Sequence, residues 1–445
     1  MGKITKCEGY AGAVGLFVRE RQGSSVTVYK VQPVTWQCRF FCYLFQLVNG
    51  SIFFQSEDVM TLTDHPMMNY DPEHHTKLES EPMGGYDLKT FCSVRKIGGK
   101  VHEKYRSRFQ WALKTSWMTL PLRIMEDLRY SGKIRNTKIE KDPIFIIGFF
   151  RTGTTYLHLL FSKDKKLAYM SNLEGYTPNF YLSFEKMSRD LLQKSLPPTR
   201  PMDNVPLLLD EPIEEEYAVG ASSRYSFYNA LIWPEKFDYF CKYLSFDDCP
   251  PKDVERWKKV YHRALQKVTF KKGGRQLVLK NPPNTFKIKY LLEMYPKAKF
   301  IYTYRNPYTL YASMYKFWLK TCEIFSVQEF KEDYDKIKDG FLKLFNESLN
   351  KLAEAKHHIP PENFIEIKYE DFVENPIPFM KTLYEKFELE GFEEVEPEFL
   401  AHYSSQKERY IANKWDLNDE VIRDVNANWN VYREQYGYER LEPTS

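Results

Sequence analysis

An anion-binding loop is predicted at residues 144–155, which read IFIIGFFRTGTT. Gly148 and Gly153 have the separation of the two glycines in the phosphate-binding pattern G-x-x-x-x-G-K-[ST], and Thr155 keeps its hydroxyl. Glycine lets a phosphate approach the backbone, and the first N–H groups of the following helix point toward it. Thr154 stands where that pattern has a lysine. The stretch therefore predicts an anion site, and the missing lysine argues against β,γ-phosphate chemistry with magnesium.

Two more basic residues follow predicted strands and are candidate partners of an anion. Lys280 ends the run LVLK, and Arg305 directly follows FIYTY, with Ser313 eight positions further on. The forked guanidinium of arginine suits phosphate, and Arg151 and Thr152 add donors inside the loop. Two alternatives stay open, because Arg305 could pair with a carboxylate and Ser313 could simply permit close helix packing.

Candidate proton acceptors lie in two places. The stretch PIEEE places Glu214 and Glu216 after a proline, where acidic residues also favour the first turn of a solvated helix. Consecutive positions point in different directions, so only one or two of these glutamates could face a cleft. His158 lies one helical turn after Thr154 and is a third candidate, although a histidine satisfied within helix packing fits equally well.

The elements that must position these residues alternate between short apolar strands and helices. The predicted strands are 144–148, 275–283, 298–307 and 363–372. The predicted helices are 154–162, 285–296, 307–320, 326–356 and 378–389. This alternation predicts an α/β fold, a P-loop-like parallel sheet flanked by helices on both faces. Such folds bind ligands at the carboxyl ends of their strands, where the candidate residues fall.

The chain before the first strand is predicted to form an extension and then a helical region. Residues 1–100 show weak periodicity and many turn formers, which predicts an irregular N-terminal extension, and residues 101–445 are predicted to form the main domain. Apolar positions recur with helical spacing over 101–132, and Pro121 should kink or divide that region.

The residue composition of the chain narrows the classes of function. Lys and Arg number 64 against 60 Asp and Glu, a net charge of +4 without a basic stripe, which argues against nucleic-acid binding. Seven scattered cysteines without a CxxC pair indicate neither a disulfide scaffold nor a zinc site, so a reducing, cytoplasmic location is the simplest expectation. The most apolar stretch, 34–54, contains Gln37, Arg39 and Gln46, so no transmembrane segment is predicted.

Taken together, these motifs resemble those of the sulfotransferases that use 3′-phosphoadenylyl sulfate (PAPS) as donor. FRTGTT at 150–155 is similar to their first loop, with Phe150 in place of a proline, and YEDFVENP at 369–376 also looks like theirs. The nearer resemblance is to a bacterial-type branch, which includes enzymes similar to one that sulfates a hydroxylated menaquinone. The motifs of that branch read here RTGTTYLH, PIEEE, VLKNPP and YPKAKFIYTYRNP. The resemblance spans about 143–440.

The resemblance implies where such a donor would bind. The residues that would hold its 5′-phosphosulfate are Arg151, Thr152, Gly153, Thr154 and Thr155. Arg305 and Ser313 would hold the 3′-phosphate, Tyr369 would lie near the adenine, and Lys280 would lie close to the bridging oxygen. A donor with two separate phosphates explains the missing lysine, and no metal is expected.

Chemistry with this donor would resemble phosphoryl transfer, an in-line displacement with charge spread over the peripheral oxygens. Arg151, Lys280 and the loop N–H groups could stabilise charge on the leaving phosphate. The acceptor hydroxyl needs a general base, for which Glu214 is the first choice, Glu216 the second and His158 the third.

The acceptor is predicted to be a small, apolar or lipid-like alcohol. The aromatic runs GYTPNFYLSF at 175–184 and SRYSFYNALIWP at 223–234 suggest an apolar site, although large aromatic residues also serve core packing. Peripheral contact with a membrane is left open. Two other classes remain, a P-loop kinase or NTPase, for which we find no well-placed acidic magnesium ligand, and a catalytically silent nucleotide-binding protein.

Overall fold

The computed structural model describes six stretches of the chain, which belong to two units. The described residues are 16–22, 25–31, 82–197, 206–329, 334–409 and 417–444. In the first unit, residues 1–70, strands β1 (Leu16–Gln22) and β2 (Ser25–Val31) pair antiparallel. This hairpin differs from the irregular structure predicted there. The apolar stretch 34–54 lies outside the described residues.

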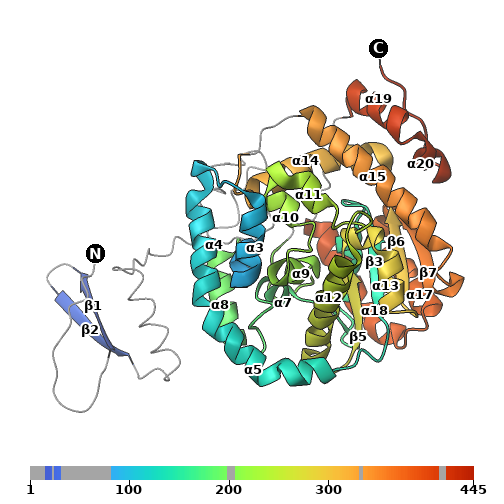
Figure 1. Ribbon diagram of the computed structural model, residues 1–445. Coiled ribbons are helices and arrows are strands. Elements are labelled where there is room, and N and C mark those ends of the chain that lie inside the picture. Colours follow the sequence, from blue (N-terminus) through green and yellow to red (C-terminus); the bar gives the residue numbers. More distant parts are fainter. Residues whose placement is uncertain are drawn as a thin grey trace. The chain divides into compact units, whose positions relative to one another are not determined.

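The second unit, residues 71–445, is built on a parallel sheet of five strands (Figure 1). The strands are β3 (Ile144–Gly148), β4 (Leu167–Ala168), β5 (Gln276–Lys280), β6 (Lys299–Tyr304) and β7 (Phe364–Lys368). Their order across the sheet is β4-β5-β3-β6-β7, so β3 is central. The parallel α/β sheet is confirmed, and the short strand β4 is an addition to the predicted set.

The pairing register brings the ends of the three central strands to the same edge. Gly148, the last residue of β3, pairs with Thr303 of β6, and Lys280, the last residue of β5, pairs with Ile146. The chain passes from β5 to β6 across β3, which makes this edge the point where the strand order reverses. Ligands of open α/β sheets bind at that point.

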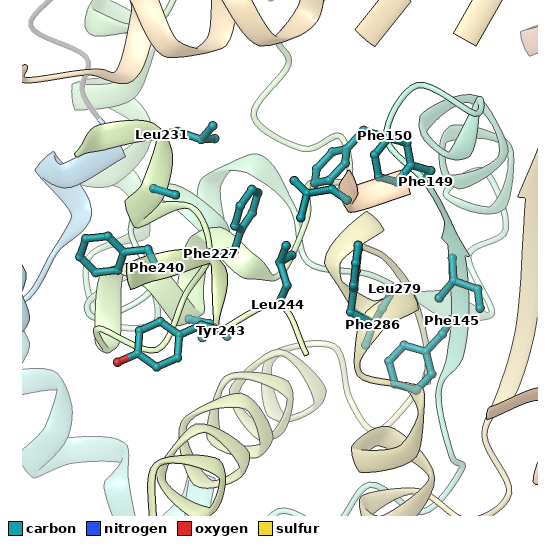
Figure 2. Close-up of a cluster of buried hydrophobic side chains, with 14 of the residues drawn as sticks. Phe145, Phe149, Phe150, Phe227, Leu231, Phe240, Tyr243, Leu244, Leu279 and Phe286 are labelled. Carbon is teal, nitrogen blue, oxygen red and sulfur yellow. The ribbon is translucent and has the colours of Figure 1, made fainter. Parts of the chain in front are cut away.

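Alternate residues of the strands face two hydrophobic clusters, one on each side of the sheet. Phe145 and Ile147 of β3 belong to the larger cluster, and Ile144 and Ile146 to the smaller one. Because both faces are covered, the strands are almost entirely apolar. Figure 2 shows part of the larger cluster, which runs from Phe145 in the sheet to Phe150 in the loop after β3.

Helices contribute to both clusters. Those on the smaller cluster are α6 (Thr154–Phe161), α16 (Tyr369–Glu374), α17 (Pro376–Lys386) and α18 (Phe392–Arg409). Those on the larger cluster are α3 (Leu88–Gly98), α4 (Arg106–Met118), α9 (Glu216–Ser222), α10 (Asn229–Ile232), α11 (Phe237–Cys241), α12 (Pro251–Lys271), α13 (Ile288–Met294), α14 (Pro307–Phe325), α15 (Tyr334–Lys356), α19 (Asp419–Asn428) and α20 (Asn430–Gln435). Helices α7 (Asn172–Tyr176) and α8 (Glu185–Ser195) pack on each other through a third, small cluster.

Pro121 divides the helical region before the sheet, as predicted. Helix α4 ends just before α5 (Leu120–Asn136), and Pro121 lies in the first turn of α5, where its missing N–H has no helical partner to lose. The structured part of this unit begins before residue 101, because α3 falls within the predicted extension and its Phe91 and Val94 join the larger cluster.

Two long helices follow β6. Helix α14 continues to Phe325, five residues past the predicted end, and α15 begins at Tyr334 rather than near residue 326. Over the part of the chain that the structure describes, no helix is long and apolar enough to cross a membrane.

Candidate active site

The loop between β3 and α6 passes through backbone conformations that favour glycine. Gly148 and Gly153 have φ angles of 149° and 88°, and Arg151 has a φ of 68°, which is unfavourable for a residue with a side chain. Thr152 Oγ1 closes the turn by donating to the carbonyl of Phe149 at 2.7 Å. The loop leads directly into α6, whose first N–H groups have no acceptor within the helix.

Two threonines that we did not single out in the sequence fasten this loop to its neighbours. The Gly148 N–H donates to Thr285 Oγ1 at 2.9 Å, and the Thr285 hydroxyl donates to the Gly148 carbonyl at 3.0 Å. Thr303 Oγ1 lies 2.9 Å from Thr152 Oγ1, and a Cβ on Gly148 would lie 2.6 Å from the same Thr303 atom. Each threonine lies within five residues of a candidate basic residue, which is the only signal that the sequence offers.

The two predicted anion sites are neighbours. Arg305 Nη1 donates to the carbonyl of Arg151 at 3.0 Å, and Arg151 Nε donates to Ser313 Oγ at 3.2 Å. The guanidinium carbon of Arg305 lies 4.5 Å from the centre of the Tyr369 ring. Tyr369 also packs on the loop, because a Cβ on Gly153 would lie 2.1 Å from its Cδ2. The structure therefore brings these five predicted residues together at the strand ends.

A cavity lined largely by apolar side chains adjoins the loop. Of the 30 described residues in its wall, ten are aromatic. Both predicted aromatic runs contribute, with Tyr176 and Phe180 from the first and Phe227 and Tyr228 from the second. The polar candidates in the same wall are Arg151, Thr154, Thr155, Glu214 and Lys280. An apolar ligand in this cavity would thus contact the charged groups at the strand ends.

Lys280 and Glu214 form an ion pair at the wall of this cavity. Lys280 Nζ donates to Glu214 Oε1, and the side chains are only 2% and 15% exposed. Electrostatic interactions are stronger in such a poorly solvated place than in water. A carboxylate and an ammonium held together in this way can act on one reacting centre, the first as proton acceptor and the second as a stabiliser of negative charge.

The other glutamates of PIEEE turn into a buried polar network instead. Glu216 Oε2 accepts from Asn281 Nδ2 at 3.1 Å and lies 3.2 Å from Lys287 Nζ, and the Glu216 and Lys287 side chains are fully buried. Glu215 Oε1 accepts from the Tyr261 hydroxyl at 2.6 Å, and burial raises the pKa of Glu215. Glu216 holds α9 to the end of β5 and is outside the wall of the cavity.

His158 is buried on the inner side of α6. Its Nε2 lies 3.1 Å from the carbonyl oxygen of Val278, so this nitrogen carries the proton. Burial, and then the nearby charge of Lys280, lowers the pKa of His158 to about 3. An imidazole with so low a pKa is a weak base near neutral pH. The identity of the general base stays a prediction, for which the geometry favours Glu214.

Replacing Glu216 by glutamine is expected to act on stability rather than on chemistry. Because the ammonium of Lys287 would then be buried without its counter-charge, we expect the free energy of unfolding to fall by about 3–5 kcal/mol. Denaturant unfolding measures this change, and adding Lys287→Met should restore much of it. Unchanged stability together with a large loss of turnover would instead place Glu216 in the chemistry.

A metal site does not emerge from the described residues, among which no three His, Cys, Asp or Glu side chains gather so as to hold an ion. Whether activity needs a metal stays a prediction.

Comparisons with known proteins find sulfotransferases. A model described as the sulfotransferase family matches residues 143–394, which include every predicted site residue. The chain is 29% identical over 342 residues to the omega-hydroxy-beta-dihydromenaquinone-9 sulfotransferase Stf3 of Mycobacterium bovis (strain ATCC BAA-935 / AF2122/97) and to that of Mycobacterium tuberculosis (strain CDC 1551 / Oshkosh). Each match covers 76% of this chain and 87% of the relative.

Two solved structures share the fold. Sulfotransferase STF1 from Mycobacterium tuberculosis H37Rv matches with a TM-score of 0.55 and 18% identity, over 83% of this chain and 93% of its own. Sulfotransferase STF9 from Mycobacterium avium matches with a TM-score of 0.58 and 16% identity, over 87% of this chain and 100% of its own. At these identities the likeness is one of fold.

Proposed function

Because the chain belongs to the sulfotransferase family, we propose that it moves the sulfuryl group of PAPS to a hydroxyl of a small apolar or lipid-like acceptor. The alcohol would become its sulfate ester, with release of adenosine 3′,5′-bisphosphate and a proton. The observation that carries this proposal is the hydrogen bond from Arg305 Nη1 to the carbonyl of Arg151, at 3.0 Å. A nucleoside that bears phosphates at two positions needs two anion sites within the length of one ligand.

We assign the 5′-phosphosulfate to residues 151–155 and the 3′-phosphate to Arg305 and Ser313. Two observations support the fit. Tyr369 contacts both the loop at Gly153 and the guanidinium of Arg305, so an aromatic ring lies beside both anion sites, where an adenine can stack. Arg151 and the buried Lys280 supply positive charge next to a loop that lacks the usual lysine.

In this proposal Glu214 takes the proton of the acceptor hydroxyl and Lys280 stabilises negative charge on the leaving phosphate oxygen. The donor, when bound, supplies the sulfuryl group. The ion pair of Lys280 and Glu214 suits both roles, because an ammonium drawn toward the leaving oxygen releases the carboxylate to accept a proton. Arg151, whose guanidinium is fixed by its contact with Ser313, adds a second positive charge.

The cavity supports an apolar acceptor. Ten aromatic residues line its wall together with Glu214, and such a wall suits an apolar ligand whose hydroxyl lies at the carboxylate. The curated relatives are named for a menaquinone-derived lipid alcohol. At 29% identity we carry over the class of acceptor, a long apolar alcohol, and leave the compound itself open.

Thermal unfolding in EDTA tests the donor. Adenosine 3′,5′-bisphosphate should raise the unfolding temperature, since a ligand at 100 times its Kd stabilises the native state by about 2.7 kcal/mol. Adenosine 5′-phosphate, which lacks the 3′-phosphate, is the matched control and should stabilise less. Stronger protection by ATP with magnesium would favour a kinase or NTPase, and bisphosphate binding without sulfuryl transfer to any alcohol would favour a catalytically silent protein.

A further inference from the structure

Helices α4 and α5 present an apolar surface to solvent. Trp117, Ile124, Met125 and Leu128 are 58%, 51%, 49% and 83% exposed, and we call these four residues the α4–α5 apolar face. On α5 they have the spacing i, i+1 and i+4 of one helix side, while Glu126 is buried on the opposite side. The face is therefore the outer side of a well-packed helix and not a frayed end.

The clustering of this face is unusual. Exposed apolar residues are ordinary when scattered singly, whereas a contiguous patch marks an interaction site. Among the described residues eight large apolar side chains are exposed, and four of them fall within the twelve residues of the α4–α5 apolar face. Two more, Leu191 and Leu208, lie on or beside segments that line the acceptor cavity.

The charges around the face are mostly positive. The exposed basic residues of α4 and α5 are Arg106, Lys114, Arg129, Lys133 and Arg135. Asp127 is the one exposed acidic residue of these two helices, and Arg263 Nη2 donates to its Oδ1 at 2.8 Å. An apolar helix side with a tryptophan and basic flanks is the composition of segments that lie in the interface of an anionic membrane.

The cavity reaches α4, and α5 is hydrogen-bonded to its wall. Trp111 and Thr115 of α4 line its wall, and Arg123 on the inner side of α5 donates to the carbonyl of Gly85, another wall residue, at 3.3 Å. Leu191 of α8 lines the cavity and is 40% exposed, so it lies at the rim. Helices α4 and α8 thus line the same cavity.

We propose that the α4–α5 apolar face docks on an anionic lipid bilayer, and that the acceptor enters the cavity from that bilayer past the rim of α8. The second part rests on the proposed function. Burial of the four apolar side chains in the interface gives the binding free energy, and the basic flanks add attraction that weakens with salt.

Vesicle sedimentation with the full chain tests the docking. We expect binding to vesicles of phosphatidylglycerol and phosphatidylcholine, weaker binding at high salt, and little binding to phosphatidylcholine alone. The variant Ile124→Gln/Leu128→Gln should lower the partition constant by about tenfold or more. The matched control is Leu400→Gln/Val431→Gln, which removes two exposed apolar side chains of α18 and α20 and should bind as the unmodified chain does.

Several results would overturn the proposal. If the unmodified chain does not bind anionic vesicles, or if both double variants lose binding equally, the chain does not dock through this face. A solution dimer that Ile124→Gln/Leu128→Gln dissociates, with vesicle binding unchanged, would make the face an interface between two copies. Lower unfolding stability of that variant with unchanged vesicle binding would mean that another part of the chain covers the face.

Sulfation rates in micelles and in vesicles distinguish a failure of this proposal from a failure of the proposed function. With radiolabelled PAPS, Ile124→Gln/Leu128→Gln should sulfate hexadecanol in detergent micelles at the unmodified rate and hexadecanol in anionic vesicles at least several-fold more slowly. Equal rates from vesicles would contradict delivery of the acceptor from the bilayer. Failure to label any alcohol would defeat the proposed function, whereas the sedimentation result would stand by itself.

Discussion

Replacing Glu214 by glutamine is expected to lower kcat by about 10²–10⁴-fold and to leave the Kd of adenosine 3′,5′-bisphosphate almost unchanged. Glutamine keeps an oxygen that can accept from Lys280 Nζ, so the wall of the cavity stays intact while the base is lost. Transfer of radiolabel from PAPS to an alcohol measures the first quantity, and calorimetric titration the second.

Because Glu214 and Lys280 form an ion pair, a double variant tests their joint role more sharply than Glu214→Gln alone. Because groups that act as a unit give non-additive losses, Glu214→Gln/Lys280→Met should be much less impaired than the product of the two single effects implies. His158→Gln is a useful contrast, since a histidine with a pKa of about 3 and a contact to the Val278 carbonyl should affect folding more than the pH profile. Normal turnover in Glu214→Gln would place the base elsewhere.

Gly153→Ala is expected to weaken bisphosphate binding by roughly tenfold or more, through loss of the stacking surface for the adenine. The added Cβ would lie 2.1 Å from Cδ2 of Tyr369, so the ring must move away from the loop. The ring also borders Arg305, and its displacement should disturb the 3′-phosphate site as well.

An alanine variant at Gly274 is the control that distinguishes the clash with Tyr369 from backbone strain. Gly274 has a φ of 79°, close to the 88° of Gly153, but a Cβ there would meet nothing within 4 Å. Both alanine variants should lose about 1–2 kcal/mol of stability from the left-handed backbone, and only Gly153→Ala should lose affinity. Equal affinities in calorimetry would mean that Tyr369 does not contribute to the donor site.

The sheet and its loops were predictable because parallel strands covered on both faces read as short, uninterrupted apolar runs. The stretch 144–148 is such a run, and the glycines that follow mark the turn. Arg305 and Lys280 could be placed at one edge because all strands of a parallel sheet end there. The pairing of Gly148 with Thr303 shows that β3 and β6 end at the same edge.

Other features depend on information that the local pattern does not contain. The three glutamates of PIEEE are the same residue type, and only the directions of their side chains differ. The ion pair of Glu214 and the burial of Glu216 therefore depend on how α9 packs. Ile124 and Leu128 have the spacing of a core-facing stripe yet face outward, because periodicity identifies an apolar side and not what covers it. Helix α12 is different, since Trp257, Tyr261 and other buried apolar residues recur at helical spacing, although the predicted helices do not include it.

A crystal structure with adenosine 3′,5′-bisphosphate is the most direct test of the account. We expect the 5′-phosphate within hydrogen-bonding distance of the N–H groups at Gly153 and Thr154, and the 3′-phosphate on Arg305 and Ser313. The adenine should contact Tyr369. A nucleotide bound with its 3′-phosphate away from Arg305, or outside the edge where β3, β5 and β6 end, would contradict the joined anion sites and the reaction proposed from them.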